Sequence, residues 1–518
     1  MPCTSHDRSR ALPDEAPPAD VLIVGGGIMG AAVAALLREG DPNLDILMLD
    51  AGPVIGSVPG EHLHESADPE IWSRYNVRVS SGIQGLYAGD ETLQPAVDDL
   101  DRLEPGMHRL GTLGQDAGGL TGAAIAWNAG GMGVHWTAAT PWPAAHERFG
   151  DPARWEADLD TARRLLRVTP APIGPTAPGE RVLEVLRARF AATTTPEREP
   201  QPMPMAVRVV DGRRVRTGPA TIFPPIARGD DPHFTLRTDA LVTALLHEGG
   251  RVVGARTHGF ADGEDRTFRA TTTIVCADAF RTPQLLFASG IRPAALGRYL
   301  NEHAFSSNRI VMDLDRFGIA VASLPTAADD EFVTDSLWIP TTGHDQPYHA
   351  QVMNRTYVDD EGAPLGYGVG VSVYVPVESR AENRLVFDDA AADLTGMPRM
   401  RVEFAYSDAD RALIEGATTM VAGIAAELGE WDPQRDSKLL DAGSSLHITG
   451  TVRTGDADDG TSVCDPAGRV WGYDNLYVAG NGVIPTALAA NSTLTGVVTA
   501  VRAAEAVLAS HAESRSTE

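Results

Sequence analysis

The chain has 518 residues, of which 43% are hydrophobic and 22% are charged, both ordinary values for a soluble globular protein. The net charge of −27 disfavours nucleic acid and anionic membranes as partners, because phosphate groups bind basic surfaces. A chain of this length is too long for one compact core, so we expect two domains.

The N-terminal segment predicts neither a signal peptide nor a membrane anchor. Residues 1–17 are rich in proline and charge and predict a disordered lead-in. Acidic residues such as Asp14 and Asp20, rather than a basic segment, precede the apolar stretch from Val21 to Leu37. No other apolar run in the sequence approaches transmembrane length, so we expect a cytoplasmic protein without a membrane partner.

A dinucleotide-binding motif follows the lead-in. The apolar run 21–24 predicts a buried strand, the residues Gly25-Gly26-Gly27-Ile28-Met29-Gly30 a glycine turn, and 31–37 a helix. The run 46–49 predicts a second strand, which Asp50 closes. This order of strand, turn, helix and terminal acid is typical of a Rossmann-like unit that binds a dinucleotide.

Each residue type in this motif has a physical role in the prediction. Gly25 permits the tight turn, Gly27 lets the backbone approach a pyrophosphate, and Gly30 lets the helix pack against the strand. Asp50 can accept a bond from a ribose hydroxyl. The motif alone does not separate FAD from NAD. The residues expected to contact the dinucleotide here are Gly25, Gly27, Ile28, Met29, Gly30, Asp50 and Ala51.

Further elements of this fold are scattered along the chain. The pattern of apolar residues predicts strands at 234–237, 251–256, 273–277 and 476–479, and helices at 240–247, 280–291 and 494–508. Gly249-Gly250 is interpreted as the end of the helix at 240–247. The fold class predicted is therefore α/β, with a discontinuous Rossmann-like domain.

The stretch from about 310 to 440 differs from this pattern. Alternating segments at 371–377 and 400–406 predict an antiparallel sheet, and a helix is expected from Asp408 to Leu428. We interpret the stretch as an inserted α+β substrate domain. The predicted division assigns residues 18–145, 205–308 and 441–518 to the dinucleotide-binding domain, and residues 146–204 and 309–440 to the substrate-binding domain.

The cysteines predict no metal or redox site. Cys3, Cys276 and Cys464 are odd in number and widely spaced, without a CxxC pattern. We expect free or buried thiols and no metal. This usage fits a reducing compartment.

Four blocks, in this order, resemble the pyranose oxidase branch of the glucose-methanol-choline (GMC) oxidoreductase superfamily, which includes bacterial C-glycoside 3-oxidases. They are residues 130–141 (GGMGVHWTAATP), 296–303 (LGRYLNEH), 382–385 (ENRL) and 446–451 (LHITGT). The resemblance covers most of residues 20–510. It implies an FAD-binding domain with an inserted substrate domain.

The resemblance assigns chemistry to two late residues. It implies that His447 is the base that accepts a hydroxyl proton and that Asn491 bonds the same substrate oxygen. Histidine suits the role because its unperturbed pKa lies near neutrality. Taken without the resemblance, His447 fits a core histidine and Asn491 fits a helix N-cap, since Ser492 and Thr493 follow.

The resemblance also implies a set of flavin contacts. His135 corresponds to the residue that carries a covalent flavin in the branch, but the common threonine before it is Val134 here, so non-covalent FAD is favoured and a covalent link stays possible. Val452 replaces a second histidine of the fungal enzymes, whose chains are longer. The expected flavin contacts are Met132, His135, Trp136, Thr137, Ala277, Gly480, Asn481, Asn491 and Thr493.

These features predict an FAD-dependent oxidoreductase that converts a secondary ring hydroxyl of a pyranose or glycoside to a ketone, favouring C3 of a C-glycoside. The alternatives are pyranose 2-oxidation of free D-glucose and oxidation of a non-sugar alcohol within the superfamily. A flavin-fold protein without redox turnover is disfavoured by the presence of both His447 and Asn491. O2 or a quinone-like acceptor would take the electrons. His349 is expected to be solvated or packed rather than bound to substrate.

Overall fold

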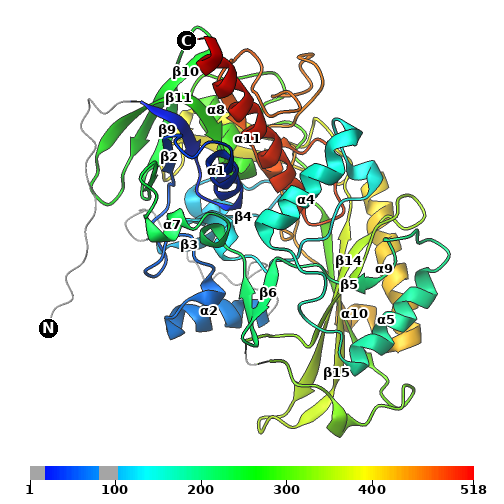
Figure 1. The fold of residues 1–518 in the computed structure, drawn as a ribbon. Coiled ribbons are helices and arrows are strands. Elements are labelled where there is room, and N and C mark those ends of the chain that lie inside the picture. The colour runs from blue at the N-terminus through cyan, green and yellow to red at the C-terminus, as the bar shows by residue number, and fades with distance from the viewer. Residues whose placement is uncertain (1–17, 81–102, 329, 518) are drawn as a thin grey trace, which may run out of the picture.

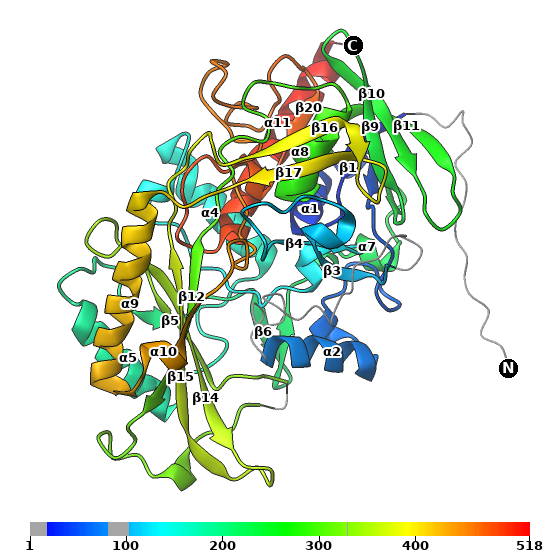
Figure 2. The ribbon, with the colours of Figure 1, turned by 180° about the vertical axis from the view of Figure 1, so that it is seen from behind.

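The computed structural model describes residues 18–80, 103–328 and 330–517, so the predicted lead-in and Cys3 lie outside the described residues. Two large sheets dominate the fold (Figure 1). Figure 2 shows the same two sheets from behind, one toward each end of the molecule.

The first sheet is the predicted dinucleotide-binding sheet. Its strand order is β8 (Phe234–Arg237), β2 (Ile46–Leu49), β1 (Ala19–Val24), β11 (Asp265–Val275), β10 (Arg251–His258) and β9 (Leu241–Glu248), with β20 (Leu476–Val478) paired to β11. Strands β8, β2, β1, β11 and β20 run parallel, whereas β9 and β10 are antiparallel. Because parallel strands end at the same edge, the loops after β1, β2, β11 and β20 meet there, where such sheets bind ligands.

The two faces of this sheet bury different partners. Val21 and Ile23 of β1 belong to one core with helices α1 (Ile28–Gly40), α4 (Trp155–Leu166) and α11 (Ser492–Thr517). Leu22 and Val24 belong to a second core with β9, β10 and helix α8 (Asp278–Ala288). All four side chains are at most 4% exposed. This burial on both faces explains the continuous apolar run at 21–24, which is typical of parallel sheets.

The predicted helix at 240–247 is wrong, because these residues form strand β9. The strand pairs with β10 from Leu241 to Glu248. Gly249 and Gly250, interpreted from sequence as a helix end, have φ of +55° and +79° and form the tight turn of a hairpin. Two adjacent residues with positive φ are typical of the type I′ turn, whose twist matches that of the paired strands. Pairing with β10 therefore overrides the helical propensity of the Ala and Leu residues.

The second sheet is antiparallel and forms one wall of the site. Its strand order is β18 (Gly429–Glu430), β12 (Ala304–Met312), β15 (Pro364–Val375), β14 (His349–Val358), β13 (Asp335–Ile339) and β5 (Gln201–Pro202), with β19 (Ser437–Leu439) paired to β12. Helices α9 (Asp408–Leu428) and α5 (Ala177–Phe190) cover one face (Figure 1). Helix α9 matches the prediction, and its N-cap Ser407 accepts from the backbone N–H of Asp410, which returns the contact in a capping box.

A separate hairpin corrects the expected extent of that sheet. The segment 400–406 was expected in the same antiparallel sheet as 371–377, but β17 (Pro398–Glu403) pairs only with β16 (Arg384–Ala392) among the described strands. Leu385, Met400 and Val402 of this hairpin pack with Phe280 of α8. Helix α4 likewise joins the core of α1 and α11. The division into domains stays a prediction.

Shorter elements lie between the strands and helices of the two sheets. They are α2 (Pro69–Ser80), β3 (Gly106–Arg109), β4 (Ala124–Trp127), β6 (Val207–Val210), β7 (Arg213–Arg216), α6 (Pro219–Ile222), α7 (Pro225–Arg228), α10 (Pro433–Asp436) and the 3-10 helices η1 (Leu63–Glu65), η4 (Gly131–Val134) and η8 (Asn481–Val483). The other predicted strands and helices are present. β2 and β8 have the predicted ends, whereas α1 and α11 are longer than expected and β11 begins at Asp265.

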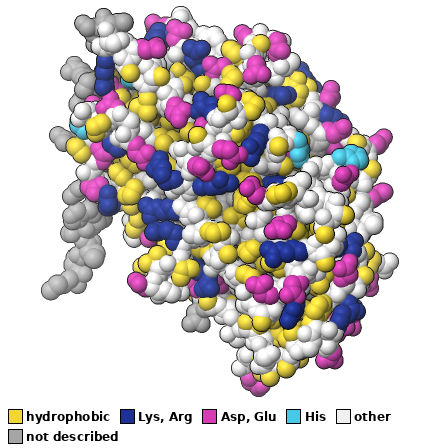
Figure 3. Space-filling model, turned by 45° about the vertical axis from the view of Figure 1, so that its right-hand side comes forward, with side chains coloured by type: hydrophobic (Ala, Val, Ile, Leu, Met, Phe, Trp, Pro, Cys, Tyr) yellow, Lys and Arg dark blue, Asp and Glu magenta, His cyan; other side chains and the backbone are white. Residues whose placement is uncertain are grey.

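Helix α11 is the one described helix with the length and composition to cross a membrane, and 72% of its apolar window is buried inside the fold. Val497, Val498 and Val501 are at most 1% exposed against α1 and α4. The apolar character of the helix is therefore explained by its place in the core. On the face in Figure 3, acidic and basic side chains are interspersed rather than gathered by sign.

Candidate active site

The turn after β1 is built so that only glycine fits at two positions. Gly25 has a φ of +104°, and a Cβ there would lie 2.5 Å from the carbonyl oxygen of Cys276. A Cβ on Gly30 would lie 2.0 Å from the carbonyl oxygen of Gly25. The chain therefore turns tightly out of β1 into α1, whose N-terminus opens at the carboxyl edge of the sheet and favours a negative charge there.

Asp50 lies where β2 ends and is 7% exposed. Its Oδ2 accepts from the backbone N–H groups of Gly26 at 3.0 Å and Gly130 at 3.1 Å, and its Oδ1 accepts from that of Gly52 at 3.1 Å. Burial raises the pKa of the Asp50 carboxyl, while these three bonds oppose the rise. The carboxylate joins the glycine turn to the loop before η4, and its predicted bond to a ribose hydroxyl stays a prediction.

A cavity of about 620 Å³ runs from this turn to the second sheet. Its lining includes the expected base and the expected cofactor contacts, with Gly30 as the exception, because Gly30 supports the turn from behind. The predicted residues in the lining are Gly25, Gly27, Ile28, Met29, Asp50, Ala51, Met132, His135, Trp136, Thr137, Ala277, His447, Gly480, Asn481, Asn491 and Thr493. Segments far apart in sequence thus meet at one site, while their individual roles stay predictions.

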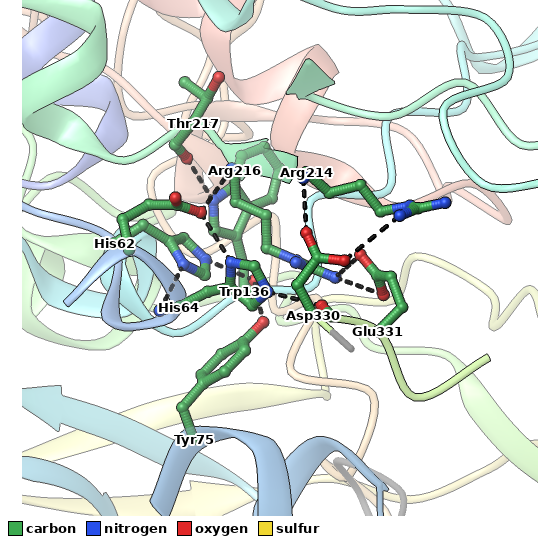
Figure 4. A network of polar contacts seen from close by, with 10 residues as sticks. His62, His64, Tyr75, Trp136, Arg214, Arg216, Thr217, Asp330 and Glu331 are labelled. Carbon is green, nitrogen blue, oxygen red and sulfur yellow. Dashed lines mark hydrogen bonds and ion pairs between the residues drawn. The ribbon is translucent and has the colours of Figure 1, made fainter. Parts of the chain in front are cut away.

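A polar network holds the segment that carries Trp136 and Thr137 (Figure 4). The carbonyl oxygen of Trp136 accepts from His62 Nε2 at 2.8 Å and from the Tyr75 hydroxyl at 3.3 Å. The Trp136 indole donates to the carbonyl of Thr217 at 2.8 Å. These bonds fix the backbone of the segment from η1, α2 and the loop after β7, so the cavity wall has a defined shape there.

The same network contains a buried ion pair. The guanidinium of Arg216 donates to both carboxylate oxygens of Glu331, at 2.7 and 2.9 Å, and both side chains are at most 1% exposed. Figure 4 places the pair beside Asp330 and His64. Since Phe332 and Val333 follow directly and line the cavity, the pair anchors this part of the wall.

His135 lines the cavity, and its ring also lies within hydrogen-bond distance of Asn128. Its Nε2 stands 2.8 Å from Asn128 Oδ1, and the side chain is buried. Because an amide oxygen only accepts, Nε2 carries the ring proton in this contact.

The far end of the cavity brings His447 and Asn491 together. Asn491 Nδ2 lies 3.1 Å from His447 Nε2, although the two residues are 44 positions apart. Asn491 is buried at the start of α11, and His447 is half-buried and faces the cavity. Burial, together with His303 and His349 nearby, holds the pKa of His447 well below its usual range. The imidazole is therefore neutral at physiological pH, and the Asn491 NH2 group that faces Nε2 requires the lone pair on that nitrogen.

The loop before His447 is held by a buried carboxyl group. Glu302 accepts from the Ser445 hydroxyl and, at 3.2 Å, from the backbone N–H of His447. Leu446 between them has a φ of +62°, a conformation that L side chains rarely adopt. Burial raises the pKa of Glu302 to about 8, although these bonds oppose the rise. The strained turn therefore fixes the direction of the His447 side chain.

The second sheet faces the pair with ordered rows of side chains. The register places Gln351 of β14, Ser372 of β15 and Ser307 of β12 side by side in one row. All three line the cavity. The next rows outward carry Met353, with Gly370 beside it, and Arg355. The wall thus offers hydroxyl and amide groups close to His447.

The comparisons with known proteins identify the family of the chain. Residues 201–305 and 379–500 match the two models of the GMC oxidoreductase family, N-terminal and C-terminal. A C-glycoside 3-oxidase from Microbacterium trichothecenolyticum is 39% identical over 94% of this chain and 95% of its own. The chain belongs to the GMC oxidoreductase family.

Other known proteins share less sequence identity with this GMC oxidoreductase. A C-glycoside 3-oxidase from Arthrobacter globiformis is 37% identical over 94% of both chains. A pyranose 2-oxidase from Tricholoma matsutake is 28% identical over 94% and 93% of the two chains. The solved structure of pyridoxine 4-oxidase from Mesorbium loti has a TM-score of 0.63 at 18% identity, covering 94% of this chain and 99% of its own, and so shows the fold.

The residues present fit FAD, the cofactor of the family. The glycine turn, the N-termini of α1 and α11 and the buried Asp50 all meet the cavity. Asn481 Oδ1 is buried there without a partner among the described residues, as expected of a group that awaits a donor. Bound FAD supplies an acceptor for hydride at its N5 atom.

Sequence reasoning did not single out several side chains at the end of the cavity that contains His447. Trp338, Gln351 and Glu302 were not singled out, and His349, expected to be solvated or packed, is fully buried and bonded to Asn491. The i, i+2 spacing of His349 and Gln351 would have placed both on one face if the strand that begins at His349 had been predicted. Nothing in the sequence pattern pairs them with Asn491.

We predict that Glu302 lowers stability as pH rises. Its pKa is raised to about 8 in the folded state, so between about pH 4.5 and 8 the unfolded chain releases the proton and the folded chain keeps it. Stability should therefore fall by about 1.4 kcal/mol per pH unit from this group alone. Glu302→Gln removes this dependence.

The measurement is the difference in melting temperature between the wild-type holoenzyme and Glu302→Gln at pH 5, 6, 7 and 8. The buried histidines are common to both proteins, so their effects cancel. The melting temperature of the wild type minus that of Glu302→Gln should fall steadily from pH 5 to pH 8. A difference that stays constant across this range would contradict the raised pKa.

Proposed function

We propose that this GMC oxidoreductase oxidises the C3 hydroxyl of the pyranose ring of a glycoside, with C-glycosides as the preferred class, to a ketone. The observation that carries the proposal is the contact of 3.1 Å between Asn491 Nδ2 and His447 Nε2 at the end of the FAD cavity. The C3 position is supported by the 39% and 37% identity to two C-glycoside 3-oxidases over 94% of the chain.

The two side chains present a base and a donor to one oxygen atom. His447 accepts the hydroxyl proton at Nε2: the low pKa keeps the imidazole neutral, and the NH2 group of Asn491 faces Nε2 as a donor, so the ring proton is on Nδ1. Asn491 donates from Nδ2 to the same oxygen and holds it in place. Removal of the proton raises electron density on the oxygen and promotes departure of hydride from the attached carbon.

The cavity wall supports a polyol substrate rather than an apolar alcohol. Gln351, Ser372 and Ser307 form a row of polar groups on the second sheet. Tyr374 and Phe305 stand in the adjacent row and line the same cavity, so they offer apolar surface to a ring. A pocket with few polar groups set among aromatic side chains suits a ligand that has hydroxyls around an apolar ring.

The finer properties of the cofactor and its oxidant belong to the same proposal. We propose non-covalent FAD, because the contact of His135 Nε2 with Asn128 Oδ1 needs the proton on Nε2 that a bond to the flavin methyl carbon would remove. O2 or a quinone-like acceptor completes the turnover. A cytoplasmic location is supported by Cys276 and Cys464, which are free and buried.

The proposed substrate is tested by anaerobic stopped-flow reduction of the bound flavin. An aryl C-glucoside should reduce the flavin faster than D-glucose at equal concentration, and NMR of the product should show a ketone at C3. Faster reduction by D-glucose with a ketone at C2 would instead identify a pyranose 2-oxidase. Reduction by neither sugar would overturn the assignment and leave a non-sugar alcohol.

The flavin linkage is tested by acid precipitation of the purified holoenzyme. If FAD is not covalently bound, the yellow colour should remain in the supernatant and the mass of the precipitated chain should equal that of the polypeptide. His135→Ala is a matched control, since its supernatant should look the same. Colour in the pellet of the wild type, lost in His135→Ala, would contradict the prediction.

A further inference from the structure

Four side chains form a line of hydrogen bonds that ends at the proposed base. Trp338 Nε1 donates to His349 Nδ1 at 2.7 Å, and His349 Nε2 lies 3.1 Å from Asn491 Oδ1. Asn491 Nδ2 in turn lies 3.1 Å from His447 Nε2. Trp338 stands on β13 and His349 on the adjacent β14, and both are fully buried.

The bond from Trp338 to His349 fixes the direction of the other hydrogen bonds in the line. An indole N–H can only donate, so His349 Nδ1 must accept and the single proton of the neutral ring is on Nε2. That proton points at Asn491 Oδ1, which can only accept. The NH2 group of Asn491 is thereby turned toward His447, whose Nε2 must accept.

A second contact supports the same orientation of the amide. Gln351 Nε2 donates to Asn491 Oδ1 at 2.9 Å, so the oxygen receives two donors. Burial lowers the pKa of His349 well below its usual range, and His303 and Arg198 nearby act in the same direction. His349 therefore stays neutral, as the direction of the bonds requires.

The orientation of the Asn491 amide decides what a substrate hydroxyl meets. With its NH2 group toward the cavity, Asn491 donates to the hydroxyl oxygen while His447 accepts the proton. With the amide reversed, its oxygen would compete with His447 for that proton and repel the oxygen lone pairs. One hydrogen bond contributes up to about a factor of ten to such a difference.

We propose that His349 is a positioning residue, and that Trp338, by placing the proton of His349 on Nε2, locks the Asn491 amide with its NH2 group toward the substrate oxygen. The consequence for the reaction rests on the proposed function of His447 and Asn491. The direction of the hydrogen bonds does not rest on that function, because these bonds exist in the protein without substrate.

The direction is measured by nitrogen-15 NMR of the holoenzyme labelled in histidine. The His349 signals are identified by their absence from His349→Gln. In the wild type, His349 Nε2 should have the shift of a protonated nitrogen and Nδ1 that of an unprotonated one. Trp338→Phe removes the donor and should move both shifts toward a mixture of the two forms, whereas Trp142→Phe, a change in the indole that packs at 4.6 Å on Trp338, should leave them in place.

The effect on the reaction is measured by anaerobic flavin reduction with an aryl C-glucoside. Trp338→Phe and His349→Leu should lower the limiting rate constant about tenfold, with the dissociation constant of the sugar nearly unchanged. His349→Gln should recover most of the rate, because its amide can accept from Trp338 and donate to Asn491. FAD content and melting temperature of each variant identify loss of fold.

Three results would overturn the proposal. They are a wild-type His349 protonated on Nδ1, a Trp338→Phe protein with the shifts and rate of Trp142→Phe, and a His349→Gln protein as slow as His349→Leu. Failure of every sugar to reduce the wild type would instead contradict the proposed function, and the NMR result would still decide the direction of the bonds.

Discussion

The hydrogen bond between Asn491 and His447 lies where three parts of the chain that are far apart in sequence meet. Asn491 begins the helix that fills the core beside α1, and His447 follows a strained turn held by Glu302. His349, on the antiparallel sheet, bonds the same amide. The contact therefore depends on the correct placement of both sheets. It sets the proposed base and the proposed donor at the end of the cavity, and the buried His303 and His349 beside them stay neutral and keep charge away from that base.

The other end of the cavity depends on steric constraints and on one buried, hydrogen-bonded carboxyl group. Gly25 and Gly30 exclude any side chain, and the three backbone N–H groups around Asp50 keep that carboxylate in one place. A long cofactor fits only if these two ends keep a fixed separation. The polar network around Arg216 and Glu331 adds to this by holding the wall between them.

The sequence predicted the parts of the fold that are set by neighbours in the chain. The turn at Gly25 and the helix from Asp408 to Leu428 lie within continuous local patterns, so periodicity and capping were sufficient. Strand β9 was predicted as a helix because its Ala and Leu residues also suit a helix. Only its pairing with β10 makes it a strand. The segment 400–406 was expected in the wrong sheet because alternation indicates a strand but does not say which strand it pairs with.

The site was predicted unevenly for a related physical cause. His447 and Asn491 were paired only through the resemblance to a family, since 44 residues separate them. His349 and Asn491 are 142 residues apart, and no spacing rule relates a strand residue to a distant helix start. Trp338 is the clearest example of what sequence cannot predict. Its proposed role follows from one indole proton whose direction is defined only by the tertiary structure.

The most direct test of the account is the rate constant for anaerobic flavin reduction by an aryl C-glucoside in His447→Gln, with FAD content and sugar affinity measured alongside. The account predicts a loss of about 10²–10⁴-fold in that rate constant, the range for removal of a general base, with FAD bound and the affinity little changed. A rate constant within a few-fold of the wild type would show that His447 does not accept the proton and would contradict the central claim.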